Sequence, residues 1–305
     1  MLPQFLSPVY LYGAYLRRTF TASGLSSQTM DIDSETTIHF WGPIPKTNQN
    51  TSQKPSLVLI HGFGPLAVFQ WRQQVQFFSP QFNVYVPDLV FFGGSTTKSS
   101  ERAETFQAVS VGKLLERLGV QRFHVMGTSY GGFVAYHMAR MWPERVQKVV
   151  IASSGINMRP RDMEALLKRA KREKIEELML PATAGQFRTL MGLSVFKRFQ
   201  IVPDFLLNDF VHKLYAEKRK EKMELLKAVT LGKDDTPNVS PLQQEVLIVW
   251  GDHDHIFPIE MATELKELLG EKTRLEVMKG TSHVPQIENP KQFNNIVESF
   301  LRGSL

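Results

Sequence analysis

A serine with the setting of a nucleophile lies in the segment 127–132, which reads Gly-Thr-Ser-Tyr-Gly-Gly. An apolar run at 123–126 precedes it and a helix-like run at 133–141 follows it, so the pattern predicts a strand, a tight turn with Ser129 at its apex, and a helix. Such a turn exposes the hydroxyl, and the helix N-terminus favours negative charge beside it. The G-x-S-x-G spacing alone would arise by chance in roughly a tenth of chains this long. The prediction therefore depends on partner residues elsewhere in the chain.

A serine hydroxyl needs a base to accept its proton, and His283 is the best-placed candidate. It follows the last predicted strand, 273–278, and precedes the last predicted helix, 290–301. An acid that orients this base should come earlier in the chain, and the loop after Trp250 offers Asp252 and Asp254. Asp254 lies deeper in that loop, so we predict Ser129, Asp254 and His283 as the catalytic residues. Other histidines fall inside predicted strands and helices or on the acid loop: His39, His124, His137, His212, His253 and His255.

The acid loop also raises the alternative of a metal site, because Asp252, His253, Asp254 and His255 are all potential ligands. Adjacent residues of one loop seldom converge on an ion without distant ligands. We therefore expect no metal.

Two backbone N–H groups are predicted to stabilise an oxyanion: that of Tyr130, after the serine, and that of Phe63, in the glycine-rich turn 61–64. This turn follows a short, wholly apolar strand at 57–60, which is where open α/β sheets place ligands. The residues predicted to line the substrate pocket are Phe63, Gly64, Tyr130, Phe257 and Val284.

Alternating strands and helices must position these groups, and they predict a doubly wound, mostly parallel sheet. Residues 28–33 and 36–42 predict an antiparallel hairpin. We expect an N-terminal helical segment at 1–27, a core formed by 28–155 and 241–305, and an inserted helical cap, or lid, at 156–240. Within the cap the clearest predicted helices are 164–174 and 211–229. The many methionines of the cap have two interpretations: ordinary packing between helices, or an adaptable apolar wall over a lipophilic substrate.

Composition excludes several classes of protein. The 305-residue chain has no cysteine, which excludes disulfides, and no run of 18 apolar residues. Its formal net charge of +6 matches the surplus in residues 156–222, which hold 15 Lys and Arg against 9 Asp and Glu. The charge is thus local, which argues against a nucleic-acid-binding protein. We expect a cytoplasmic monomer, with peripheral membrane contact through the N-terminus and cap as a separate hypothesis.

Residues 1–30 contain no Asp or Glu, which also leaves an organelle-targeting segment as an alternative to a mature helix there.

The combined motifs resemble those of the α/β-hydrolase superfamily over about residues 28–301, notably the stretches 57–64, 84–94, 127–132, 250–258 and 282–290. The amino-acid sequence at 85–95 resembles that of a group of plant α/β hydrolases, which is similar to monoacylglycerol lipases of the α/β-hydrolase-domain type. The resemblance implies hydrolysis of carboxylic esters without a cofactor. One departure is Ser282, where the family usually has glycine before the histidine, and we expect it to change little.

The leading hypothesis is a serine esterase or lipase that acts on a lipophilic small-molecule ester. An acyltransferase, a hydroxynitrile lyase or a carbon–carbon hydrolase could use the same three residues. A small-molecule receptor of the strigolactone or karrikin type, with a cap that recruits a partner, is the alternative from a different class. Haloalkane dehalogenases and soluble epoxide hydrolases share the predicted fold but use a carboxylate nucleophile, which Ser129 does not provide.

Overall fold

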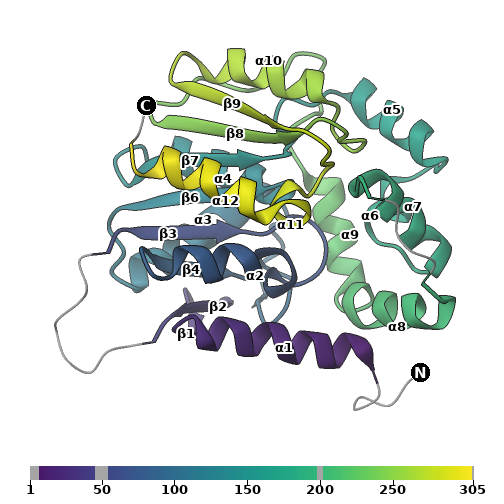
Figure 1. The fold of residues 1–305 in the computed structure, drawn as a ribbon, viewed down its shortest axis with the longest axis horizontal. Coiled ribbons are helices and arrows are strands. Elements are labelled where there is room, and N and C mark those ends of the chain that lie inside the picture. The colour runs from purple at the N-terminus through teal and green to yellow at the C-terminus, as the bar shows by residue number, and fades with distance from the viewer. Residues whose placement is uncertain (1–6, 45–53, 198–201, 304–305) are drawn as a thin grey trace.

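A nine-stranded, mostly parallel sheet forms the centre of the computed structural model, which describes residues 7–44, 54–197 and 202–303 (Figure 1). Across the described sheet the strand order is β1-β2-β4-β3-β6-β7-β8-β9, and β5 pairs with β2. The strands are Leu25–Asp31 (β1), Thr36–Pro43 (β2), Ser56–Ile60 (β3), Asn83–Pro87 (β4), Thr96–Thr97 (β5), Phe123–Thr128 (β6), Val146–Ala152 (β7), Glu245–Gly251 (β8) and Thr273–Met278 (β9). The predicted mostly parallel sheet is confirmed.

The strands from β3 to β9 on the main path pair in parallel, while β1 and β2 form the predicted antiparallel hairpin. Alternate side chains of β3 enter two different apolar clusters: Val58 and Ile60 pack on one face of the sheet, and Leu57 and Leu59 on the other. Burial on both faces explains why residues 57–60 of this strand are all apolar.

Helices cover both faces of the sheet. Buried side chains of α1, α2 and α12 join the cluster that contains Leu57, and those of α3, α4 and α10 join the cluster that contains Val58. These helices, with the short α11, are Pro8–Ala22 (α1), Ala67–Phe78 (α2), Glu104–Arg117 (α3), Tyr130–Met141 (α4), Ile259–Leu269 (α10), Pro285–Glu288 (α11) and Pro290–Leu301 (α12).

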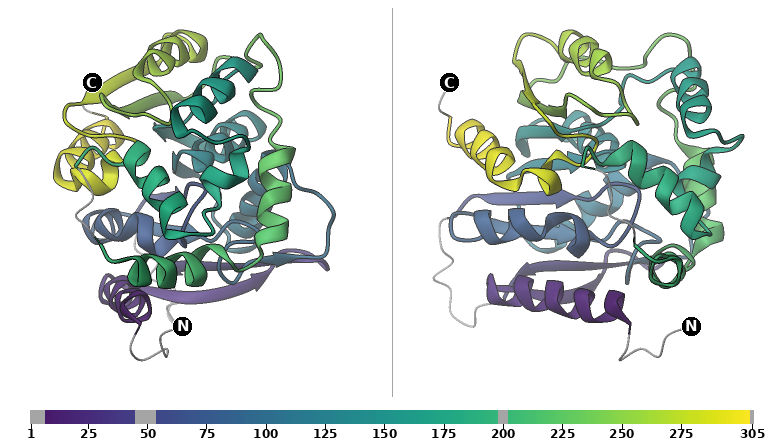
Figure 2. Two further views of the ribbon diagram at one scale, coloured as in Figure 1. Left: turned by 90° about the vertical axis from the view of Figure 1, so that its right-hand side faces the viewer. Right: turned by 45° about the vertical axis from the view of Figure 1, so that its right-hand side comes forward.

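The remaining helices lie between β7 and β8 in the chain and gather at one end of the sheet, on the right of Figure 1 and toward the viewer in the left panel of Figure 2. They are Pro160–Ala170 (α5), Ile175–Met179 (α6), Ala184–Ser194 (α7), Asp204–Tyr215 (α8) and Arg219–Ala228 (α9). We refer to α5–α9 as the inserted helices. Their predicted role as a separate lid domain stays a prediction.

Three predicted elements differ from the structure. The helix predicted at 164–174 spans Pro160–Ala170, and Lys171 just after it adopts a left-handed backbone with φ 53°. The helix predicted at 211–229 is two helices, α8 and α9, because the chain turns between them and Lys218 adopts a left-handed backbone with φ 50°. The segment 1–27, predicted as helical, contains α1 and then the start of β1 at Leu25, while residues 1–6 lie outside the described ranges.

Helix α1 packs on the main body through one face only. Ser7 caps its N-terminus and also donates a hydrogen bond of 2.5 Å to the buried Asp209 of α8. Four of its large side chains, Tyr10, Leu11, Tyr12 and Tyr15, are exposed, although the Tyr12 ring also contacts Phe69 of α2. No helix in the described part of the chain is long and apolar enough to cross a membrane. Peripheral membrane contact stays a prediction.

A buried carboxylate ties the inserted helices to the sheet-flanking helix α3. Glu104 accepts hydrogen bonds from the N–H groups of Thr230 and Leu231, just after α9, and from the Thr230 hydroxyl. His137 Nε2 lies 3.5 Å from Glu104 Oε1. Burial alone would raise the pKa of Glu104, but the hydrogen bonds from His137 and Thr230 outweigh it and lower the pKa to about 2.

The stability of the protein should fall in acid because of this one group. A carboxyl whose folded pKa is depressed stabilises the fold above its unfolded pKa of 4.5, and this contribution is lost as the pH falls toward 2. Glu104→Gln should lower the free energy of unfolding by about 3 kcal/mol at pH 7, and the difference from wild type should shrink by about 1 kcal/mol by pH 3.5. Urea unfolding at both pH values measures this. A difference that stays constant with pH would contradict it.

Candidate active site

The backbone turns sharply at Ser129, between β6 and α4. Ser129 has a φ of 52°, in the left-handed region, and its N–H donates to the carbonyl of Ala152 at 2.9 Å. A Cβ on Gly127 would lie 2.1 Å from the Gly131 carbonyl oxygen, and one on Gly131 would lie 2.2 Å from the Ile60 carbonyl oxygen. Backbone would have to move to relieve either contact, so this turn requires both glycines.

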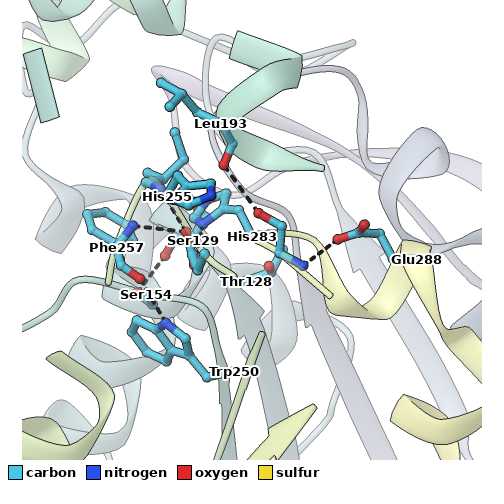
Figure 3. Close-up of polar contacts among 12 residues, drawn as sticks. Thr128, Ser129, Ser154, Leu193, Trp250, His255, Phe257, His283 and Glu288 are labelled. Carbon is cyan, nitrogen blue, oxygen red and sulfur yellow. Dashed lines mark hydrogen bonds and ion pairs between the residues drawn. The ribbon is translucent and has the colours of Figure 1, made fainter. Parts of the chain in front are cut away.

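Ser129, His283 and Asp254 form a continuous chain of hydrogen bonds, and Figure 3 shows the serine and histidine within it. His283 Nε2 lies 3.0 Å from Ser129 Oγ, and His283 Nδ1 lies 2.9 Å from Asp254 Oδ2. The three residues follow β6, β9 and β8, whose carboxyl ends meet at one edge of the sheet. With Nδ1 protonated and held by Asp254, Nε2 can accept the serine proton.

The orientation of Asp254 is fixed by backbone donors. Its Oδ1 accepts hydrogen bonds from the N–H groups of Ile256 at 2.8 Å and Phe257 at 2.9 Å, which leaves Oδ2 for the histidine. The Trp250 indole donates to the Phe257 carbonyl and braces the same loop (Figure 3). The Asp254 side chain is fully buried.

Asp252, the other carboxylate of this loop, does not bond the catalytic histidine. Its Oδ1 accepts from the N–H of Gly280 and contacts His253 Nδ1 at 2.6 Å, so it braces the loop after β9. Burial raises the pKa of Asp252, but the bonds from His253 and Gly280 lower it more, and the net pKa is below its ordinary value. In the described ranges no group of three or more His, Asp and Glu side chains is arranged to hold a metal.

The two N–H groups predicted to bind an oxyanion lie on the loops beside the serine. Tyr130 is the first residue of α4, so its N–H has no acceptor within the helix. Within the described part of the chain the N–H of Phe63 also has no acceptor. Gln70 bonds the N–H of Gly62 at 2.8 Å and the carbonyl of Pro65 at 3.0 Å, which holds the Phe63 loop in place.

His61 braces this loop from the other side. Burial lowers the pKa of His61, which keeps the ring neutral. Its Nδ1 donates to the Gly62 carbonyl at 2.8 Å, and its Nε2 accepts from the Leu89 N–H at 2.9 Å. The bracing roles of His61 and Gln70 were absent from the sequence predictions, although His61 lies within the glycine-rich turn that was recognised.

A cavity of about 620 Å³ opens beside Ser129 and His283. Side chains of α1, α2, α7 and α8 form most of its wall, and they are largely apolar. The wall includes Pro8, Val9, Tyr12, Phe63, Gly64, Pro65, Phe69, Gln70, Thr128, Met179, Phe187, Leu190, Met191, Ser194, Val195, Val202, Leu206, Leu207, Phe210, Tyr215, Ile256, Val284, Ile287 and Glu288.

Three of the five predicted pocket residues, Phe63, Gly64 and Val284, line this cavity, and the other two do not. The Tyr130 ring is buried behind the wall, with its centroid 5.8 Å from that of Phe63. The Phe257 ring packs edge-on to His283 at 5.5 Å. Both side chains therefore support residues of the site from behind, and their predicted contribution to a substrate pocket stays a prediction. The contribution of α1 had no sequence signal, because it depends on how distant elements pack.

The serine before the histidine does more than expected. Ser282 Oγ donates to the carbonyl of Leu193 at 3.2 Å, and its N–H donates to Glu288 Oε1 at 2.6 Å. Figure 3 labels Leu193 and Glu288, the acceptors of these two bonds. Glu288 Oε2 accepts from the N–H of Phe196, just after α7. The histidine loop is thus bonded directly to the inserted helices, and a glycine at 282 would lack the hydroxyl bond.

Comparisons with known proteins identify a matching family profile and several similar proteins. Residues 55–290 match the sequence profile of the alpha/beta hydrolase fold family. The chain is 23% identical to 2-hydroxy-6-oxo-6-phenylhexa-2,4-dienoate hydrolase of Comamonas testosteroni, over 81% of this chain and 87% of the relative. It is also 23% identical to monoacylglycerol lipase abhd6-B of Xenopus laevis, over 81% and 75%.

A crystal structure of a bacterial membrane phospholipase A superposes with a TM-score of 0.77 at 21% identity, over 97% of this chain and 90% of that one. At this identity the superposition shows a shared fold. The resemblance to plant α/β hydrolases stays a prediction.

Proposed function

Because the chain belongs to the alpha/beta hydrolase fold family, we propose that it hydrolyses the carboxylic ester of a lipophilic small molecule through an acyl-enzyme on Ser129. The observation that carries this proposal is the bonded chain from Ser129 through His283 to Asp254, opening onto an apolar cavity. A volume of about 620 Å³ suits a ligand of ordinary small-molecule size.

The geometry supports two linked half-reactions. Ser129 Oγ attacks the ester carbonyl carbon while His283 Nε2 takes its proton, and the oxyanion is held by the N–H groups of Phe63 and Tyr130. The C–O bond to the alcohol then breaks, and His283 returns the proton to the leaving alkoxide oxygen. A water molecule repeats the attack on the acyl carbon, which releases the acid and restores the serine. Asp254 keeps the imidazole in one tautomer and stabilises the imidazolium.

The charge of the cavity wall favours a neutral ester substrate over an anionic dienoate, the substrate in the name of one relative. A dienoate carries a carboxylate, and an anion in an apolar cavity needs a cationic partner. Among the described lining residues there is no lysine or arginine, and Glu288 contributes a carboxylate of its own. Carbon–carbon hydrolysis of a dienoate is therefore the weaker candidate.

Rates on the two substrate types test this choice. We expect kcat/KM for p-nitrophenyl octanoate to exceed that for 2-hydroxy-6-oxo-6-phenylhexa-2,4-dienoate by at least about 100-fold, the equivalent of about 3 kcal/mol for an unpaired buried charge. Faster turnover of the dienoate would reject the ester proposal. Ester turnover slower than about one per minute, far below the usual range for enzymes, would favour the receptor alternative instead.

A further inference from the structure

Tyr215 is a buried polar residue in the cavity wall. It is the last residue of α8, it is 2% exposed, and its ring packs near those of Phe187 and Phe210. Burial raises the pKa of Tyr215, so its hydroxyl stays protonated and available as a donor. The hydroxyl lies 3.9 Å from the position that a Cβ on Gly64 would take. It is therefore next to the loop that carries the Phe63 N–H.

The Tyr215 hydroxyl makes no hydrogen bond with any residue in the described part of the chain. Tyr136, which is equally buried, shows the usual arrangement: its hydroxyl accepts from the N–H of Ser240 at 2.9 Å. The Tyr215 oxygen is not among the fully buried atoms of the described residues that lack a partner, so it is open to the cavity. Since Tyr215 lines the cavity, a bound molecule can supply the missing partner.

The reacting carbonyl is not the best partner for this hydroxyl. A carbonyl oxygen has two lone pairs, and the N–H groups of Phe63 and Tyr130 already provide two donors for them. A hydrocarbon acyl chain offers no acceptor. The remaining acceptor on an ester substrate is an oxygen in its alcohol part, beyond the ester oxygen itself.

We propose that Tyr215 is a specificity-determining residue whose hydroxyl donates a hydrogen bond to a free hydroxyl of a polyol monoester bound in the cavity. This rests on the proposed ester hydrolysis and names its substrate class: an apolar acyl chain joined to an alcohol that keeps at least one hydroxyl. The apolar wall receives the acyl chain, and Tyr215 distinguishes the polyol from a simple alkyl alcohol.

Two octanoate esters of equal carbon skeleton test the proposal: glycerol 1-monooctanoate, which has two free hydroxyls, and propyl octanoate, which has none. One neutral hydrogen bond is worth about 0.5–1.5 kcal/mol, so Tyr215→Phe should lower kcat/KM for the glycerol ester by about 3- to 10-fold. It should leave kcat/KM for propyl octanoate within about twofold, because only the hydroxyl is removed. The unfolding midpoint should not fall, since that hydroxyl has no partner in the protein.

Tyr136→Phe is the matched control, because it removes a buried hydroxyl that is bonded to Ser240 away from the cavity. It should lower the free energy of unfolding by about 1 kcal/mol and leave the ratio of the two esters unchanged. Equal losses on both esters in Tyr215→Phe, or no loss on either, would overturn the assignment of Tyr215. Failure of the wild type to hydrolyse either ester is a different result, and it would overturn the proposed function together with this inference.

Discussion

Ser129→Ala should lower kcat for p-nitrophenyl octanoate by about 10⁴-fold or more, because it removes the atom that forms the acyl-enzyme. The protein should stay folded, since Ser129 Oγ is bonded to His283 Nε2 and the turn itself is held by backbone contacts such as Ser129 N–H to Ala152. Steady-state kinetics measure the loss. Labelling by a fluorophosphonate probe should disappear in the same variant.

Ser153→Ala provides the comparison for this prediction. Ser153 is a buried serine after β7 whose hydroxyl has no partner among the described residues. Its replacement should keep kcat within about threefold. Undiminished hydrolysis or labelling in Ser129→Ala would show that the nucleophile is another residue.

Asp254→Asn should lower kcat by about 10⁴-fold, because it changes which nitrogen of the His283 imidazole carries the proton. The N–H groups of Ile256 and Phe257 require an acceptor at the Oδ1 position, so the new amide must turn its NH₂ toward His283 Nδ1. A ring nitrogen that accepts from this NH₂ carries no proton, which places the ring proton on Nε2, facing Ser129. The imidazole then cannot accept the serine proton.

The neighbouring carboxylate is the control. Asp252 bonds Gly280 and His253 rather than the catalytic histidine, so Asp252→Asn should keep kcat within about threefold even if it loosens the loop after β9. If Asp252→Asn were the more damaging of the two changes, the acid would have to be reassigned.

The parts of the fold that sequence could predict are those with a local cause. The buried residues of parallel strands are apolar, as at 57–60 in β3, and glycines are required where backbone segments touch, as at Gly127. Loops that follow such strands must meet at one edge of the sheet. This is why Ser129, Asp254 and His283 could be chosen from residue type and position, and the structure brings them within hydrogen-bonding distance of one another.

The features that sequence could not give depend on the packing of distant segments. Whether Tyr130 faces the cavity or packs behind Phe63 is decided by neighbouring helices, not by its place after the serine. The break between α8 and α9 occurs at Lys218, a residue type that gives no sign of a left-handed backbone. The hydrogen bond from Ser282 to Leu193 joins residues 89 positions apart, so no local sequence pattern predicts it.

Because Pro8, Val9 and Tyr12 of α1 line the cavity, its size is partly set by a segment at the far end of the chain from the catalytic histidine. The catalytic groups themselves lie on loops of the sheet, and among the described residues they make no hydrogen bond to α1. Substitutions of these α1 side chains should therefore alter which acyl chains fit while the reacting residues stay in place. For protein engineers, the cavity-lining positions of α1 offer a way to reset chain-length preference without changing the reacting residues, provided that its core residues Leu16 and Phe20 are kept.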